Sequence, residues 1–595
     1  MLRQALKSRG NRGGVSRTVG LPAPWRGLNA RDRQEEAKPG YASILDNFYP
    51  GDGEVTLRKG WASHATGLPS AAVETLMEYS TGSTQKLFAA VDDDIYDVTS
   101  AGAVSDPEVT GLTNSRWSHT MFATTGGQFL TAVNGADDLH RYDGSNWYPV
   151  YATNLYSIDY DAETGAFTVG ETLTGGTSGA TGTIVKVIDN GTTGTLWINN
   201  VSGLSFTDNE TITDSSTGSA DADGVETLLT TALTGIATTS LDQVVAHKSR
   251  LWFVEKNSLS AWYLGTLAIS GAATEFPIAA LCKRGGYLVA CSGWSVDTGD
   301  GADDFFVFLT SEGECLVYAG TDPSSASTWA LKGIYQTDRP IGRRCLLKFG
   351  ADLLILTESG VVSVSALLGA TSRWAQISEL VRPDFLAQSL SYGSSFGWQM
   401  IHYRRRGWLI VNAPSAAGAY MQFGYNSQIK PPDGWFTMSN QNGSCWGELD
   451  GDLYFGGAGT VYKADTGVSD DGDEIIGDVL WAWSSFGTGA QKRFTLARPH
   501  MRCDVAPSPQ LDMRVDYDDA QPTSSPTITS LATGADWDTA DWDVAEWGGS
   551  LSVYSQWAGV TGLGYVGGPR LKIKTSTAEF AVIRAEVVFE TGGIL

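Results

Sequence analysis

The sequence predicts an all-β protein: a β-propeller with an inserted β-module, and a β-sandwich-like platform built from the N- and C-terminal segments. Three observations predict this class. Apolar and polar residues alternate with a period of two along most of the 595 residues, whereas helical periodicity is almost absent. The 70 glycines supply tight turns, and the 20 tryptophans suit wide, half-buried strands. A strand-turn-strand unit also recurs along the chain.

The recurring unit is an apolar strand, a polar turn and a second strand that often ends in an aromatic residue. Successive units start 42, 122, 55, 47, 56 and 44 residues apart, and all but one of these steps are close to the length of a propeller blade. The spacing therefore predicts six or seven blades. The units start at Leu87, Phe129, Leu251, Phe306, Leu353, Leu409 and Leu453.

The long step has a local cause in residues 155–228. These 74 residues hold 11 glycines, 11 acidic residues and a single basic one, Lys186. Within them "FTVGETLT" (167–174) is nearly repeated as "FTDNETIT" (206–213). Removing the segment restores a step of 48, so an inserted β-module with an internal duplication is expected here.

The two ends of the chain are expected to build the platform together. Residues 42–61, "ASILDNFYPGDGEVTLRKGW", alternate on both sides of the Gly51-Asp52-Gly53 turn and predict a hairpin. Beyond about residue 470 the alternating strands become longer, as in "RLKIKTSTAEFAVIRAEVVFE" (570–590), which suits a sandwich. The hairpin can pair with these late strands. Short helices are expected only at 33–38 and from Pro383.

The chain is thus divided into six segments: a basic N-terminal arm (1–33), a platform hairpin (34–70), a first propeller segment (71–154), the inserted module (155–228), a second propeller segment (229–470) and a C-terminal platform domain (471–595). The arm carries eight basic side chains and one acid, although the whole chain has a net charge of −25. Such an acidic body repels phosphate, so it is unsuited to holding DNA but can border a DNA path. The arm is expected either to order on an acidic partner or to remain a disordered tail.

The sequence predicts no enzyme and no catalytic residue, metal site or cofactor. "TDPSSASTW" (321–329) is close to the Asp-box of sialidase-like propellers, but Asp322 lies seven residues before Trp329 instead of five. The six histidines occur singly, and the acidic turns at 297–304 and 469–474 lack the ligand phase of an EF-hand. A hydrolase stays a minor alternative. The run Arg404-Arg405-Arg406 either pairs with an acidic neighbouring subunit or keeps a turn soluble.

The cysteines and the apolar segments bear on where the protein is made. Residues 2–20 lack the apolar region of a signal peptide, and "LLILTESGVVSVSALLGA" (353–370) is strand-like, so neither a leader nor a membrane span is expected. The six cysteines include no C-x-x-C pair. Reduced strand residues in a protein made in a cytoplasm are expected.

Three segments carry a family resemblance. They are "PAPWRGLNARDRQEEAKPGYASILDNFYPGDGEVTLRKGWASHATGL" (22–68), "DPSSASTWALKGIYQTDRPIGRRC" (322–345) and "KADTGVSDDGDE" (463–474). In this order they resemble the tail nozzle, or tail tubular protein B, of T7-like and related podoviruses. The resemblance covers most of the chain outside residues 155–228, and it includes no catalytic motif.

The resemblance implies a structural virion protein of a short bacteriophage tail, made in the host bacterial cytoplasm. It implies a homohexameric ring, the tail nozzle, which closes the tube and conducts double-stranded DNA during ejection without sequence-specific binding. The implied partners are the head-to-tail adaptor protein, tail fibre or spike proteins and the host cell surface. Two other readings stay open: a receptor-binding or fibre-attachment tail module, and a plug that stabilises packaged DNA at the portal.

Basic and aromatic residues near the chain ends are the candidates for the assembly interface. The tryptophans of "DWDTADWDVAEWGG" lie five residues apart among acids and fit neither a strand face nor a helix face, so we expect a loop whose indoles dock on protein, with a surface contact as the alternative. The candidates are Arg9, Arg12, Arg17, Trp25, Arg26, Phe48, Tyr49, Arg58, Trp61, Trp537, Trp542 and Trp547.

Overall fold

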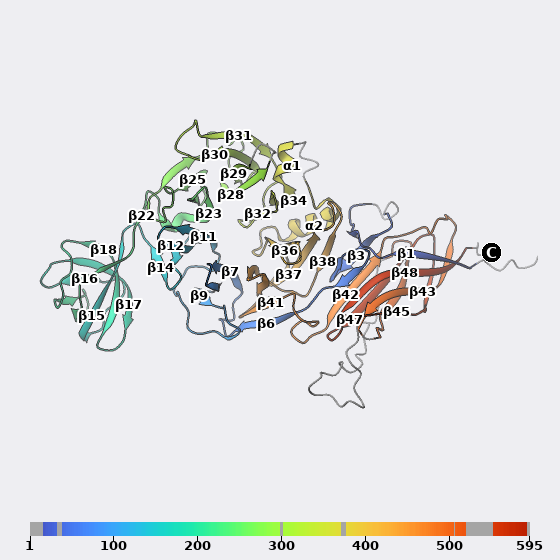
Figure 1. Ribbon diagram of the computed structural model, residues 1–595, viewed down its shortest axis with the longest axis horizontal. Coiled ribbons are helices and arrows are strands. Elements are labelled where there is room, and N and C mark those ends of the chain that lie inside the picture. Colours follow the sequence, from blue (N-terminus) through green and yellow to red (C-terminus); the bar gives the residue numbers. More distant parts are fainter. Residues whose placement is uncertain are drawn as a thin grey trace, which may run out of the picture.

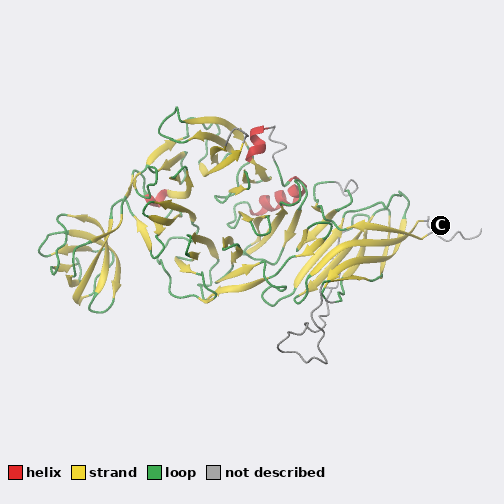
Figure 2. Ribbon diagram, viewed as in Figure 1, coloured by secondary structure: helices red, strands yellow, loops and turns green. Residues whose placement is uncertain are grey.

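The computed structural model describes residues 16–32, 38–297, 302–369, 376–504, 506–518 and 551–591. Strands and turns make up nearly all of these residues, as Figure 2 shows. A propeller lies in the middle of the molecule, with an inserted module at one end and a platform at the other (Figure 1). The all-β prediction with a propeller, a module and a platform is confirmed. Within the described ranges no helix has the length and apolarity to cross a membrane.

The described residues form a propeller of seven blades. The first strand of each blade contacts the first strand of the next, and the last of them contacts that of blade 1, which closes the ring. These strands are β7 (Val73–Ser80), β11 (Ser118–Thr124), β23 (Leu241–His247), β28 (Leu288–Asp297), β32 (Leu346–Phe349), β35 (Gln399–Tyr403) and β39 (Cys445–Leu449).

The second strands confirm the repeat that the sequence predicts, because all seven predicted unit starts lie in them. They are β8 (Gln85–Val91), β12 (Gly127–Val133), β24 (Arg250–Glu255), β29 (Ala302–Thr310), β33 (Asp352–Thr357), β36 (Trp408–Ala416) and β40 (Asp452–Gly456). Their apolar runs stand out in the sequence because these strands are buried on both sides between neighbouring blades.

The outer strands complete the antiparallel blades. They are β9 (Asp94–Asp97), β13 (Leu139–Tyr142), β14 (Trp147–Val150), β25 (Ser260–Tyr263), β27 (Thr274–Pro277), β30 (Glu314–Gly320), β31 (Trp329–Gln336), β34 (Gly360–Ser363), β37 (Ala419–Asn426), β38 (Trp435–Met438) and β41 (Thr460–Ala464). Strand β10 (Gly102–Ala103) adds to the sheet of blade 7 by pairing parallel with β6 (Trp61–Thr66). A short pairing outside the blades joins β22 (Leu233–Thr234) to β26 (Gly271–Ala272).

Blade 7 is closed by a strand from the N-terminal side of the propeller. Strand β6 (Trp61–Thr66) pairs antiparallel with β41, so that Ala65 lies opposite Val461. The sequence assigned residues 61–66 to the platform hairpin, and this boundary is wrong. The pairing ties the start of the propeller to its end.

The inserted module is a separate sheet with its own core. Its strands are β15 (Leu155–Gly165), β16 (Thr172–Gly175), β17 (Thr181–Asp189), β18 (Gly194–Ser202), β19 (Thr211–Thr213), β20 (Ser219–Ala222) and β21 (Thr227–Thr230). The two copies of the duplicated segment meet, because β16 pairs antiparallel with β19. Phe167 and Phe206, which start the two copies, are both buried in the module's core.

A buried carboxylate holds the turn that joins β16 to β17. Glu210 is 3% exposed and accepts hydrogen bonds from the backbone N–H groups of Thr177, Ser178 and Thr207. Burial alone opposes ionisation, but these hydrogen bonds hold the pKa of Glu210 below its usual value.

Replacing Glu210 by alanine is expected to lower the stability of the module by about 2–4 kcal/mol, since several buried donors lose a charged acceptor. Because folding lowers the pKa of Glu210, its stabilising effect is fully present above pH 4.5, the ordinary pKa of the group. The effect is lost as the pH falls through the lower pKa of the folded state. Hydrogen exchange of residues 155–230 measures this loss of stability in the module. Asp189→Asn, at the exposed end of β17, is the control, and equal protection in both variants would refute the role of Glu210.

The platform is a two-sheet sandwich built from both ends of the chain. Platform sheet 1 contains β1 (Ser16–Pro22), β4 (Phe48–Pro50), β5 (Val55–Leu57), β43 (Lys492–Cys503), β45 (Ser552–Ser555), β46 (Ala558–Gly564) and β48 (Phe580–Thr591). Platform sheet 2 contains β2 (Gly27–Leu28), β3 (Tyr41–Asp46), β42 (Ile475–Trp481), β44 (Gln510–Val515) and β47 (Gly567–Thr575).

The pairing of early with late strands is confirmed. Strand β5 pairs with β48, β3 pairs with β42, and β1 pairs with β48 over its whole length (Figure 1). The hairpin is narrower than predicted: only β4 and β5 form it, with Gly53 at φ 78° in the turn, while β3 lies in the other sheet. The arm is also shorter, because residues 16–22 are a platform strand; residues 1–15 lie outside the described ranges.

The platform and the propeller share one sheet. Strand β3 of platform sheet 2 contacts β38 of blade 6, so the sheet runs from β35 in the propeller to β44 at the platform edge. One apolar core likewise spans the platform and blades 4 to 7. Two helices flank this region: α2 (Arg382–Tyr392), which confirms the helix expected from Pro383, and the unexpected α1 (Val364–Gly369). Of the helix expected at 33–38, residues 33–37 lie outside the described ranges.

Candidate functional site

The joint between platform and propeller contains a buried ion pair. Arg58 follows β5 and Asp470 follows blade 7, so each lies on a connection between the platform and the propeller. The Arg58 guanidinium donates two hydrogen bonds of 2.7 Å to the two carboxylate oxygens of Asp470, and the side chains are 2% and 1% exposed. This bidentate geometry fixes both connections relative to each other.

Asn47 connects this ion pair to the sheet that the platform and the propeller share, next to β38 and at β42. Its side-chain oxygen accepts from Arg58 at 2.7 Å, and its side-chain amide donates to Ser439 Oγ and to the backbone oxygen of Ile476. Asn47 has a φ of 58°, a conformation that asparagine tolerates better than most residues. Beside it, burial raises the pKa of Asp46, whose carboxylate accepts hydrogen bonds from Ser439 and Thr437.

A second contact lies at the other side of the joint. The Arg26 guanidinium donates to Asp433 at 2.7 Å and lies 4.4 Å from the centre of the Tyr41 ring. The Tyr41 hydroxyl also donates a hydrogen bond to Asp433, and burial together with this hydrogen bond raises the pKa of Tyr41. Trp25 remains 40% exposed next to this contact. The segment 22–28, which precedes β3, is therefore held against the end of blade 6.

The triple-arginine turn pairs within the chain. Arg406 forms a bidentate ion pair with Asp465, with distances of 2.8 and 2.9 Å, and lies near the Tyr49 ring. Although burial opposes it, the hydrogen bonds and charge of Asp465 raise the pKa of Arg406. Arg405 pairs with Asp452 at 2.8 Å on the surface. Arg405 and Arg406 therefore stabilise the fold through ion pairs within the chain. This contradicts, for these two residues, the predicted alternative that the arginine run pairs with a neighbouring subunit.

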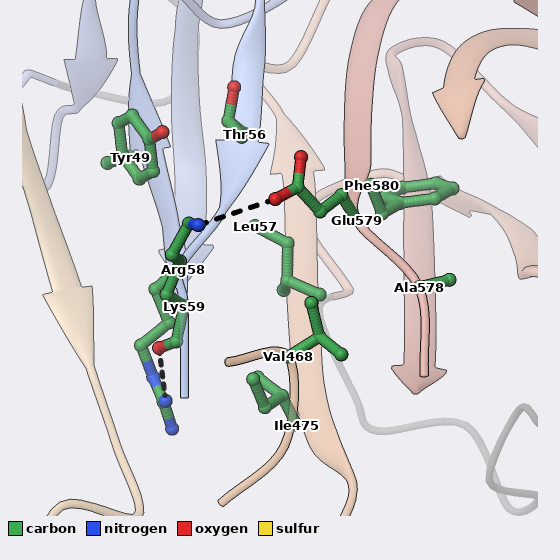
Figure 3. A pocket seen from close by; sticks show the side chains of 10 residues that line it. All are labelled: Tyr49, Thr56, Leu57, Arg58, Lys59, Val468, Ile475, Ala578, Glu579 and Phe580. Carbon is green, nitrogen blue, oxygen red and sulfur yellow. Dashed lines mark hydrogen bonds and ion pairs between the residues drawn. The ribbon is translucent and has the colours of Figure 1, made fainter. Parts of the chain in front are cut away.

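Two cavities flank the Arg58 segment. The first, of about 50 Å³, lies between β4 and β5 on one side and residues 578–580, which lead into β48, on the other (Figure 3). Lys59 closes one side of it through an ion pair with Glu579 at 3.5 Å. The second, of about 10 Å³, lies on the propeller side near Tyr403 and Asp465. Both are far below the size of a ligand pocket and have room for a few water molecules at most.

Basic side chains connect blades that are not neighbours in the ring. Arg344, just before blade 5, donates to the backbone oxygen of Glu74 and the hydroxyl of Thr75 in blade 1, at 2.7 and 2.8 Å. Arg343 pairs with Asp242 of blade 3. These contacts reach across the propeller and hold together blades that are not adjacent in the ring.

The propeller also buries neutral histidine. His140 is 7% exposed, its Nδ1 lies 2.8 Å from the backbone oxygen of Asp138, and burial lowers its pKa. A lowered pKa means that full stability is present above the ordinary value of 6.5 and declines as the pH falls below it. We expect His140→Gln to reduce this decline below pH 6.5, as measured by urea unfolding. A decline identical to that of the unmodified chain would contradict this role.

The structure places the predicted interface residues in three groups. Phe48 and Arg58 are buried inside the chain. Tyr49 packs on Arg406. The centre of the Trp61 ring lies 5.7 Å from that of Phe455 and 4.7 Å from that of Tyr462. The prediction that Phe48 and Arg58 contact other subunits is wrong, because they stabilise the joint. Surface positions include Trp25 and Arg17, the latter in β1. The predictions for Arg9, Arg12, Trp537, Trp542 and Trp547 lie outside the described residues.

The residues that matter most at the joint could not be found from the sequence. Asp470, Asn47 and Asp433 bind partners up to 429 positions away. Asp470 belongs to the acidic turn 469–474, whose sequence is typical of a solvated turn, with a cation site as the alternative, and does not indicate an arginine partner. Within the described ranges no group of three or more histidine, cysteine, aspartate or glutamate side chains is placed to hold a metal ion.

No family model and no curated protein matches the sequence. Among solved structures, the chain is similar to Raptor from Chaetomium thermophilum, with 9% identity, 68% of this chain and 29% of that chain covered, and a TM-score of 0.34. It is also similar to YCF48 bound to a D1 peptide (9% identity, 69% and 98% covered, TM-score 0.26) and to the β-propeller domain of Cps50 (Swd1) from Myceliophteria thermophila (8%, 69% and 98%, 0.23). The chain thus spans less than a third of the Raptor chain. The likeness concerns the propeller fold.

Proposed function

We propose that this chain is a structural virion protein that forms the ring-shaped nozzle of a short bacteriophage tail. The observation that carries the proposal is the platform: both chain ends combine in one sandwich, and the propeller projects from it. Most of residues 22–68, the segment that resembles tail nozzle proteins, lies in this same platform. A base made from both ends leaves the propeller free to face outward when copies assemble.

Charge supports a role as a conduit for DNA. The chain has 41 basic and 66 acidic residues, so six copies carry a charge on the order of −150. Acidic groups that line a bore repel phosphate and keep a passing duplex from binding. Salt screens this field beyond about 8–10 Å, so only groups close to the duplex contribute.

The proposed nozzle is a homohexamer with four kinds of contact. The head-to-tail adaptor binds above it, tail fibres or spikes bind at its side, double-stranded DNA passes through it, and the host surface meets its far end. In this proposal the chain acts without catalysis and without a cofactor.

The mass of the purified full-length chain tests the proposal. Sedimentation velocity across a wide range of concentrations is expected to show a species of six copies, and negative-stain images are expected to show a ring. DNA added at physiological salt is expected not to bind the outside of that ring. A chain that stays monomeric at every concentration, with and without the tail adaptor, contradicts the proposal.

The inserted module favours fibre attachment or receptor binding as a second function. It combines 11 acidic residues and one basic residue with exposed apolar side chains at Leu204 and Val225, which are 72% and 59% exposed. It also lies at the end of the molecule away from the platform (Figure 1). Deleting residues 155–230 is expected to abolish fibre or cell binding and to leave the ring intact.

A further inference from the structure

The outer rim of blade 4 carries basic side chains that no described acidic side chain neutralises. Lys283 and Arg284 lie in the loop that leads into β28, Lys332 lies in β31, and all three residues are exposed. Among the described residues, none of the three side chains forms an ion pair or a hydrogen bond. Three uncompensated cations therefore lie on one blade of a chain whose net charge is −25.

The loop that carries two of these cations is fixed on one face of blade 4. The backbone N–H groups of Lys283 and Arg284 donate to the Glu314 carboxylate at 3.0 and 3.1 Å, and Glu314 is only 4% exposed. Glu314 begins β30 and lies directly opposite Gln336 of β31. The loop therefore lies over the end of these two strands, next to β31.

Exposed apolar side chains lie beside the cations on the same face. Ile334 and Leu331 of β31 lie opposite residues of β30 that share the face of Glu314, and they are 39% and 37% exposed. Tyr287, at the end of the loop, is 46% exposed. An exposed apolar patch with a charged rim marks a protein interaction site. We call this surface the basic flank; it consists of Lys283, Arg284, Tyr287, Leu331, Lys332 and Ile334.

The outer rim of blade 1 carries the opposite charge. Asp92 and Asp93 lie in the turn between β8 and β9, Asp106 and Glu108 lie in the segment that bridges to β9, and all four are exposed. Burial and the nearby carboxylates, Asp93 and Asp106 among them, raise the pKa of Tyr96 to about 12, so the turn and the segment bring their charges to one place. None of the four forms an ion pair with a described residue. These four residues are the acidic flank.

The two flanks lie on opposite sides of the molecule. The platform joins the propeller at blade 6, through β3 and β38. Around the ring of seven blades, blade 1 follows blade 6 by two positions and blade 4 precedes it by two. Figure 1 shows the same arrangement, because β9 and β31 lie on opposite sides of the line from the platform to the inserted module. Copies that lie side by side, with their platforms together, can therefore bring the basic flank of one to the acidic flank of the next.

Charge makes a second copy the fitting partner for the basic flank. Two copies with a net charge of −25 each repel one another, so a contact between them needs local attraction. The basic flank supplies three positive charges, and the acidic flank supplies four negative ones. Opposite charges that face each other steer association and select one orientation.

We propose that the basic flank of one copy binds the acidic flank of a second copy. The inference rests on the proposed ring, and the contact braces neighbouring propellers outside the platforms that close that ring. Because the two flanks differ, the contact is head-to-tail and repeats from copy to copy around a ring.

Reversing the charge of one flank tests the contact. The basic-flank variant of the full-length chain combines Lys283→Glu, Arg284→Glu and Lys332→Glu. The acidic-flank variant combines Asp92→Lys, Asp93→Lys and Asp106→Lys. In each variant like charges face each other, so self-association in sedimentation velocity at physiological salt is expected to weaken at least about tenfold. Thermal unfolding checks that both variants fold as the unmodified chain does, which is expected because all six residues are exposed.

Restoring the complementarity of the flanks gives the sharpest result. A chain with all six substitutions has the net charge of the unmodified chain, and its flanks again carry opposite charges, so it is expected to assemble as the unmodified chain does. An equimolar mixture of the two single-flank variants is expected to assemble as well, with the two chains alternating.

The outcomes separate this inference from the proposed nozzle. Single-flank variants that assemble normally overturn the inference and leave the nozzle standing. A six-substitution chain that stays as weak as the single-flank variants, or a mixture no stronger than its components, does the same. An unmodified chain that never assembles overturns both.

Discussion

Replacing Arg58 by methionine is expected to lower the free energy of unfolding by about 3–5 kcal/mol. The substitution leaves the Asp470 carboxylate buried, 1% exposed, without the bidentate partner that holds it at 2.7 Å. Asp470→Asn is expected to cost a similar amount, because it leaves the Arg58 charge uncompensated. Guanidinium unfolding followed by tryptophan fluorescence measures both effects.

The double variant and a surface pair give the controls. Arg58→Met combined with Asp470→Leu removes both charges, so it is expected to cost less than the sum of the single variants. Arg405→Met breaks an ion pair whose arginine side chain is 66% exposed, and its cost is expected to be at most about 1 kcal/mol. Equal costs for Arg58→Met and Arg405→Met would show that the joint does not depend on the buried pair.

Replacing Ala65 by aspartate is expected to open the propeller. Ala65 is fully buried in β6, opposite Val461, in the core that blades 1 and 7 share. A carboxylate there finds no described basic partner in that core and also overfills it, so a loss of at least about 4 kcal/mol is expected. Because β6 ties the two ends of the propeller, the opened form is expected to be cut by protease near residues 61–70.

A neighbouring position on the same strand separates burial from charge. Ala62 lies opposite Lys463 and is only half-buried, so Ala62→Asp is expected to cost less than about 1 kcal/mol. Protease resistance that is unchanged in Ala65→Asp would mean that β6 does not hold the ring closed.

The propeller could be predicted from the sequence because its signal is local. Strands such as β24 and β33 are buried between blades, so their apolar runs recur at the spacing of the blades. The inserted module is also visible locally: its composition changes at residue 155, and its duplicated segments pair with each other as β16 and β19.

The joint could not be predicted because its contacts are distant in sequence. The hydrogen bond between Arg58 and Asp470 spans 412 positions, and nothing near either residue marks the other as its partner. Basic and aromatic residues near the N-terminus therefore resemble an exposed interface. Phe48 and Arg58 are instead buried, since the platform covers them with strands from the other end of the chain.

The extent of the N-terminal arm could not be predicted for a related reason. Residues 16–22, "SRTVGLP", have little apolar alternation, so their sequence is typical of an unstructured basic segment. They form a strand because β48 offers a long, regular edge, and the backbone pairs over seven residues. A strand that exists through its partner carries a weak signal of its own.

A density map of the assembled full-length chain tests the central claim most directly, namely that a platform built from both chain ends is the unit that closes into a ring. We predict six platforms in contact around an acidic bore, each with β1 beside β48, and propellers that project outward. A ring held together through the propellers, or a bore lined with lysine and arginine that grip DNA, would contradict this claim.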